Sequence, residues 1–264
     1  MAGFRYRLPN ASIVIWWVAL VTVLAGCETT QTKEPAPPRD AKARQNAEVQ
    51  TQLGIGYVRQ GQLERALKRL QGAARIDPSY APAQNALGML YERLRQPDQA
   101  GRSYRRAVEL DPTFASARNN YGGWLCRNGA FKEAEAQFRA AADNPLYDVP
   151  HLALFNAGIC LQRQGDSAGA IAYLRRSVDL SPKFAPALYT LAQLNYAAKN
   201  YLSARAYFQR YLEVGKHSAK TLWLGIRIER VLGDKNAVSS YAMLLRRKFP
   251  NSEEARQLRA TKRQ

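Results

Sequence analysis

A short motif returns six times along this chain at an almost constant spacing. A small residue marks each copy, and the intervals between copies are 34, 34, 36, 34 and 33 residues. The six small residues are Gly54, Gly88, Gly122, Gly158, Ala192 and Gly225. Each is followed by an alanine and then by a bulky side chain, at Leu70, Tyr104, Phe138, Leu174, Phe208 and Tyr241. Because units of this length cannot bury an apolar face alone, the spacing predicts repeated hairpins that stack on one another.

Each unit has the composition of two helices joined by a turn. A Gly or Ala at a crossing point lets two helices approach closely, and the bulky residue fills the space beside them. Pro78, Pro112 and Pro182 stop the helices that precede them. The pattern resembles the tetratricopeptide repeat, which implies an all-α, right-handed superhelical solenoid. Its six repeats and its C-terminal capping helix with tail are expected at residues 47–80, 81–114, 115–150, 151–184, 185–217, 218–251 and 252–264.

The amino-terminal end has the pattern of an export signal. The apolar run Ile13–Leu24 has only twelve residues, whereas a membrane-spanning helix needs roughly 20. Arg5 and Arg7 precede the run, as in a signal peptide. The run ends in Leu-Ala-Gly-Cys, which resembles the lipobox of bacterial lipoproteins. That resemblance implies removal of residues 1–26 and acylation of Cys27; the alternative is an accidental cysteine after a signal anchor.

The segment 27–46 is polar and contains three prolines, which predicts a flexible tether between the acyl chains and the repeats. Glu28 follows the cysteine, whereas an Asp at this place resembles the inner-membrane retention signal of enteric lipoproteins. We therefore expect attachment to the periplasmic face of the outer membrane. The formal charge of +18 is typical of nucleic-acid binding, but export argues against nucleic acid. Anionic lipid headgroups, phosphorylated glycolipid or an acidic protein suit that location better.

The sequence offers no catalytic motif and implies no cofactor. It has only two histidines, His151 and His217, and neither belongs to a spaced acid or metal motif. Cys126, His151 and Cys160 are conceivable zinc ligands, but their spacing fits no compact ligand pattern. The sequence therefore predicts a binding protein that is not an enzyme and holds no metal.

Cys126 and Cys160 lie in the expected first helices of repeats three and four. First helices of successive repeats pack side by side, so the two thiols are placed to meet in an oxidising compartment. We therefore predict a disulfide between them. The alternative is a pair of buried free thiols that pack as small apolar groups.

The first helices also predict a binding groove, because they line the concave face of a solenoid of this kind. Asparagine amides on this face are suited to the backbone of an extended peptide, and a column of arginines is suited to carboxylates. The arginines have a second interpretation, since a cation near a helix C-terminus is favoured by the helix dipole alone. The column consists of Arg59, Arg93, Arg127 and Arg163. The predicted groove residues are Asn119, Asn120, Arg127, Phe155, Asn156, Ile159, Arg163, Tyr189 and Tyr196.

Three stretches are more particular than any repeat consensus: "NNYGGWLC", "NPLYDVPHLALFNAG" and "LWLGIRIERVLGD". Together with the lipobox and six repeats, they resemble the type IV pilus biogenesis lipoproteins, the pilot proteins of the pilus secretin. The resemblance implies an outer-membrane lipoprotein that binds secretin subunits and promotes their localisation and multimerisation. An alternative from the residues is a lipoprotein scaffold for peptidoglycan or other envelope-assembly proteins.

Overall fold

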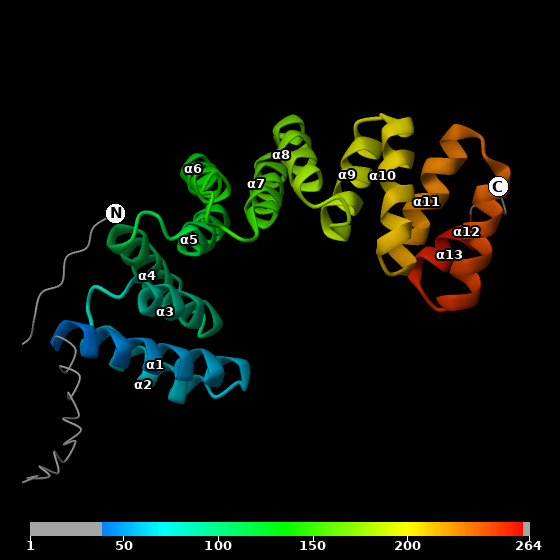
Figure 1. Cartoon of the computed structure of the whole chain (residues 1–264). Coiled ribbons are helices and arrows are strands. Elements are labelled where there is room, and N and C mark those ends of the chain that lie inside the picture. Colours follow the sequence, from blue (N-terminus) through cyan, green and yellow to red (C-terminus); the bar gives the residue numbers. More distant parts are fainter. Residues whose placement is uncertain (1–38, 261–264) are drawn as a thin grey trace, which may run out of the picture. The chain divides into compact units, whose positions relative to one another are not determined.

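The computed structural model describes residues 39–260, and in this range it contains thirteen helices and no strands. Consecutive helices form six hairpins, which follow one another along the chain and end in a single helix (Figure 1). The helices are α1 (Arg39–Arg59), α2 (Leu63–Ile76), α3 (Ala81–Arg93), α4 (Pro97–Leu110), α5 (Ala115–Arg127), α6 (Phe131–Ala142), α7 (Pro150–Gln164), α8 (Ser167–Leu180), α9 (Ala185–Ala197), α10 (Tyr201–Val214), α11 (Ala219–Leu232), α12 (Lys235–Lys248) and α13 (Glu253–Ala260). The predicted all-helical repeat fold is confirmed.

The close helix crossing inside each hairpin depends on the small residue that marks the repeat. A Cβ added to Gly88 would lie 2.5 Å from Cδ1 of Tyr104, and one added to Gly158 would lie 2.7 Å from Cγ of Leu174. Real Cβ atoms essentially never approach other atoms so closely, so the bulky residue occupies the space that glycine leaves. Tyr104 and Leu174 are accordingly buried.

The turn inside each hairpin contains one residue in the left-handed region of backbone space. Four of the six are glycines, which adopt this conformation without a steric penalty. In the second and fifth hairpins the same place is taken by Arg95, with φ of 57°, and Lys199, with φ of 62°. A side chain in this conformation costs roughly 1–2 kcal/mol, so neighbouring packing imposes the turn even where the sequence lacks glycine. The four glycines are Gly61, Gly129, Gly165 and Gly233.

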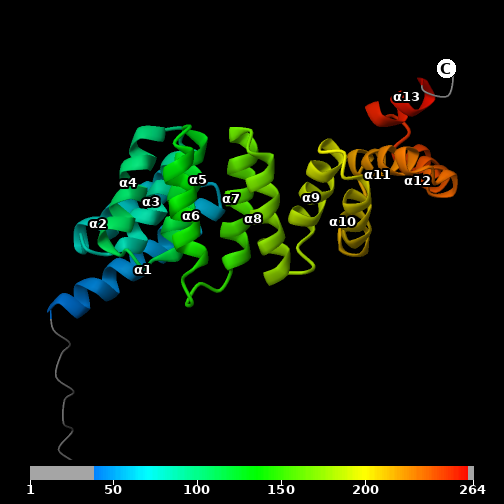
Figure 2. The same cartoon turned by 90° about the horizontal axis from the view of Figure 1, so that it is seen from above.

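First helices contact first helices in both halves of the array, and α9 also contacts α11. In the first half α1 contacts α3, α3 contacts α5, and α5 contacts α7. Each second helix packs on the first helix of the next hairpin, and Figure 2 shows the hairpins following one another in this order. At the C-terminal end, Ala255 and Leu258 of α13 are buried in a cluster with α11 and α12. The last hairpin is therefore covered by a short helix, as the capping helix of the sequence prediction requires.

The first helix is longer than expected, because α1 begins at Arg39 and the tether was predicted to continue to residue 46. Two features explain the extra turns. The segment is rich in Ala, Arg and Lys, which are strong helix formers. Arg44 also forms an ion pair with Asp77 at 2.8 Å, beyond the end of α2, and its guanidinium lies 5.0 Å from the Tyr80 ring. Tertiary contacts thus extend the helix into a segment whose prolines suggested a linker.

The predicted signal peptide, the acylated Cys27 and the beginning of the tether lie outside the described residues. None of the helices between residues 39 and 260 combines the length and the apolar character that crossing a membrane requires.

Candidate functional site

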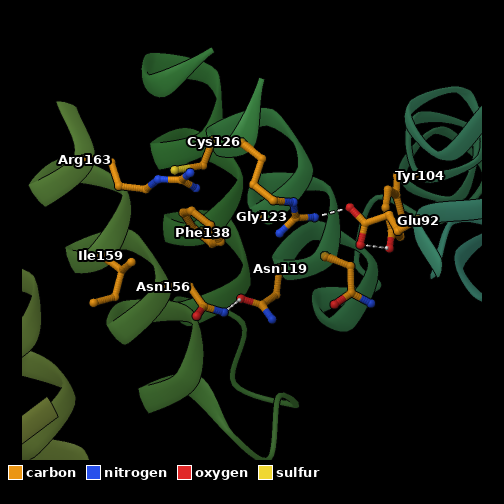
Figure 3. A pocket seen from close by; sticks show the side chains of 11 residues that line it. Glu92, Tyr104, Asn119, Gly123, Cys126, Phe138, Asn156, Ile159 and Arg163 are labelled. Carbon is orange, nitrogen blue, oxygen red and sulfur yellow. Dashed lines mark hydrogen bonds and ion pairs between the residues drawn. The ribbon is translucent and has the colours of Figure 1, made fainter. Parts of the chain in front are cut away.

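A pocket of about 220 Å³ opens between the first helices of the second, third and fourth hairpins (Figure 3). α3, α5 and α7 form its walls, and two buried rings reach it from the second helices α4 and α6. Its lining residues are Glu92, Tyr104, Asn119, Asn120, Gly123, Cys126, Arg127, Phe138, Asn156, Ile159 and Arg163. The structure thus brings six of the nine predicted groove residues into one pocket: Asn119, Asn120, Arg127, Asn156, Ile159 and Arg163.

The asparagines of the pocket form hydrogen bonds with other asparagines across neighbouring hairpins. Asn120 donates from Nδ2 to Oδ1 of Asn85 at 3.0 Å, and Asn156 donates from Nδ2 to Oδ1 of Asn119 at 3.0 Å. Two adjacent residues of α5 therefore reach in opposite directions along the row of first helices. Each pair leaves one amide nitrogen and one carbonyl oxygen unused within the described part of the chain. A peptide backbone offers the complementary groups.

Arg127 is held in the pocket by an acidic residue that the sequence reasoning missed. Its guanidinium forms an ion pair with Glu92 of α3. Tyr104 donates its hydroxyl to the other carboxylate oxygen of Glu92 at 3.2 Å. Burial and the neighbouring Glu92 charge raise the pKa of Tyr104 well above its usual range, so the phenol stays protonated and continues to donate. The charge of Arg127 is thus largely neutralised inside the protein.

The other members of the arginine column have different environments. Arg93 donates to the backbone oxygen of Val58 at 3.2 Å, so it caps the C-terminal end of α1. Arg59 and Arg163 are exposed and form no hydrogen bond or ion pair with any described residue. Only Arg163 of these two lines the pocket, where its side chain extends from α7 (Figure 3). Arg163 is therefore the cation that remains available to a ligand in this pocket.

Cys126 of α5 and Cys160 of α7 form a disulfide, with their Cα atoms 5.7 Å apart. Both residues are buried, and Cys126 lines the pocket. The bridge joins the two helices that carry Asn119, Asn156 and the arginines, across the longest connection between described hairpins, residues 143–149. The cross-link therefore fixes the distance between α5 and α7 at the pocket.

Nothing in the described residues resembles a metal site, since no group of three or more His, Cys, Asp or Glu side chains is placed to hold an ion. His151, considered above as a zinc ligand, packs its ring edge-on against Phe184 with centroids 5.1 Å apart.

Three predicted groove residues do not line the pocket. Phe155 packs edge-on against Phe184, with ring centroids 5.3 Å apart, and Tyr189 packs against Tyr211 at 5.3 Å. Tyr196 lies under the guanidinium of Arg227, 4.4 Å from its ring centroid. These half-buried rings contribute to packing in the second half of the chain. Their role as anchors for a partner remains a prediction.

Two family models of the tetratricopeptide repeat match this chain, one at residues 51–113, 85–148 and 125–184 and the other at residues 161–220. The fold and the concave pocket thus define a tetratricopeptide repeat protein, a class of helical scaffold that binds other proteins.

Within that class, the chain is 32% identical over 244 residues to the type IV pilus assembly protein PilF of Pseudomonas aeruginosa, covering 92% of this chain and 96% of PilF. The solved structure of P. aeruginosa PilF superposes with a TM-score of 0.73 at 31% identity, over 85% of this chain and 100% of that one. The structure of PilW, a widely conserved type IV pilus biogenesis factor, superposes with a TM-score of 0.70 at 34% identity, over 80% of this chain and 97% of that one. The protein belongs to this family of type IV pilus biogenesis proteins.

Proposed function

We propose that this protein is a lipoprotein of the outer membrane that binds subunits of the type IV pilus secretin and promotes their localisation and multimerisation. The proposal combines three features: the family to which the chain belongs, the lipobox ending at Cys27, and the pocket between α3, α5 and α7. Acyl chains on both the sulfur and the amino group of Cys27 would hold the protein at the membrane, because two or more lipid chains are enough for stable attachment. The repeats would then present the pocket to the secretin.

The binding step is inferred from Arg163, whose positive charge has no partner among the described residues. It lines the pocket without an internal counter-ion, next to amide groups of the Asn119–Asn156 pair. A segment of the secretin in extended conformation would place its backbone against these amides and an acidic side chain against Arg163. Ile159 and Phe138 supply an apolar floor for the rest of the segment.

Arg163→Ala tests this step without damaging the scaffold, because the side chain makes no hydrogen bond or ion pair inside the described protein. A charge-assisted hydrogen bond contributes about 1.5–3 kcal/mol, so we expect roughly tenfold to hundredfold weaker binding of purified secretin subunits. Arg59→Ala is the matched control, since Arg59 holds the same place in the first repeat, is exposed and lies outside the pocket. Equal affinities for the two variants would exclude this pocket as the secretin site.

The anchor is tested separately. Cys27→Ser should abolish acyl-chain labelling and leave secretin binding intact, so that secretin multimers form away from the outer membrane. The measurement is the amount of heat-resistant secretin multimer in outer-membrane fractions, with and without the protein. If deletion of the gene leaves that amount unchanged, the secretin function fails and a scaffold for peptidoglycan or other envelope-assembly proteins becomes the better interpretation.

A further inference from the structure

Five exposed cations gather around the turn that joins α12 and α13. Arg246, Arg247 and Lys248 form the last turn of α12. Arg256 donates to the backbone oxygen of Asn251, and Arg259 donates to that of Pro250, each at 3.4 Å. The guanidinium groups of Arg256 and Arg259 therefore lie against the turn that follows the three cations of α12. We call these five residues the basic turn: Arg246, Arg247, Lys248, Arg256 and Arg259.

The protein supplies little negative charge to this cluster. None of the five side chains forms an ion pair with a described residue. The two carboxylates between residues 246 and 260 are Glu253, which accepts a hydrogen bond from Gln257, and Glu254, whose charge acts on Tyr189 of α9. The C-terminal end of α12 carries only about half a negative charge from its dipole. The basic turn thus keeps most of its positive charge, unlike Arg127 and Arg205, which are paired internally.

We propose that the basic turn is a membrane-contact surface that binds the phosphate groups of anionic lipid headgroups. Its charge is complementary to such a surface, and clustered Lys and Arg side chains are attracted by about 1 kcal/mol each. Met243 lies one helical turn before Arg247 and is 58% exposed, which provides an apolar side chain at the interface. This contact needs neither the pocket nor the secretin, so it is independent of the proposed function.

The test uses the mature chain, residues 27–264, with Cys27→Ser so that acyl chains do not dominate binding. Its partition onto vesicles of phosphatidylcholine alone is compared with that onto an equal mixture of phosphatidylcholine and phosphatidylglycerol. We expect a strong preference for the mixture that decreases with added salt, because exposed charges are screened within about 10 Å at moderate ionic strength. No preference for the anionic vesicles would overturn the proposal.

The triple variant R246Q/R247Q/K248Q should bind the anionic vesicles roughly a hundredfold more weakly, since each cation contributes about fivefold. The matched control is K68Q/R75Q/R102Q, which removes the same charge from exposed side chains that form no ion pair among the described residues. Both variants should unfold at the same temperature as the parent. An equal loss in both would mean that net charge, not the basic turn, drives binding. Binding to soluble polyglutamate without binding to vesicles would assign the surface to an acidic protein.

Discussion

Reduction of the Cys126–Cys160 disulfide is expected to lower the free energy of unfolding and to loosen the pocket wall formed by α5 and α7. The bridge joins residues 34 positions apart. In the chain-entropy model, closing a loop of this length removes about 13 cal/mol/K from the unfolded chain, or about 4 kcal/mol at room temperature. That is a large share of the 5–15 kcal/mol by which domains are usually stable.

The effect should be local, because each repeat contacts only its neighbours. α5, α6 and α7 lie within or next to the cross-linked loop, whereas α11, α12 and α13 are packed together at the far end of the array. Reduction should therefore accelerate amide hydrogen exchange in α5 to α7 and leave the last hairpin and its cap protected.

The assay is urea unfolding followed by circular dichroism, with and without a thiol reductant. The variant with Cys126→Ala and Cys160→Ala serves as the control, because it lacks the bridge and should not respond to reductant. Secretin binding measured on the same samples reports on the pocket. If the oxidised and reduced proteins unfold within about 0.5 kcal/mol of each other, the entropic argument from loop length is refuted.

Three further predictions concern stability. Gly88→Ala should destabilise the protein by about 1–3 kcal/mol in urea unfolding because its Cβ meets a buried ring, whereas Gly56→Ala, with no atom within 4 Å of its Cβ, should stabilise by about 0.5–1 kcal/mol. Arg205→Ala leaves the carboxylate of Glu229, only 2% exposed, without its counter-ion, and should cost about 3 kcal/mol in the same assay. Burial and a hydrogen bond to a carboxylate raise the pKa of Tyr173 to about 12. The stability that the protonated Tyr173 contributes is fully present below the unfolded pKa of about 10 and is lost as the pH rises from there to about 12. Tyr173→Phe should therefore reduce the fall in unfolding temperature over this pH range.

Much of the fold follows from the repeat spacing, since the pairing of Gly88 with Tyr104 and of Gly158 with Leu174 was visible as a fixed interval in the sequence. The turns were less predictable. Arg95 and Lys199 adopt left-handed backbone although nothing in their side chains favours it, because packing of the two helices decides the turn. The beginning of α1 was also missed, since contacts of Arg44 beyond the end of α2 are invisible to local composition.

The site was predicted less completely than the fold. The sequence placed Asn119, Asn120 and Asn156 on one face, because residues at equivalent repeat positions share a face. It did not indicate that Asn120 bonds to Asn85 or that Glu92 neutralises Arg127, since these pairs depend on side-chain conformations between repeats. A signal for the first pair was present, since Asn85 and Asn119 each lie three residues before the glycine of their repeat, whereas Asn120 and Asn156 each lie two residues before it.

The cross-link between α5 and α7 has a mechanical consequence for a chain that is pulled from its ends. Force applied between residues 39 and 260 passes through the bridge from Cys126 to Cys160, so α6 and the connection at residues 143–149 carry no load. The enclosed segment cannot extend, which hides roughly 110 Å of contour length. In an optical trap the oxidised chain should therefore unravel to a shorter final length than the reduced chain. Tension applied at the two ends would straighten the outer hairpins, while the covalent link between α5 and α7 persists.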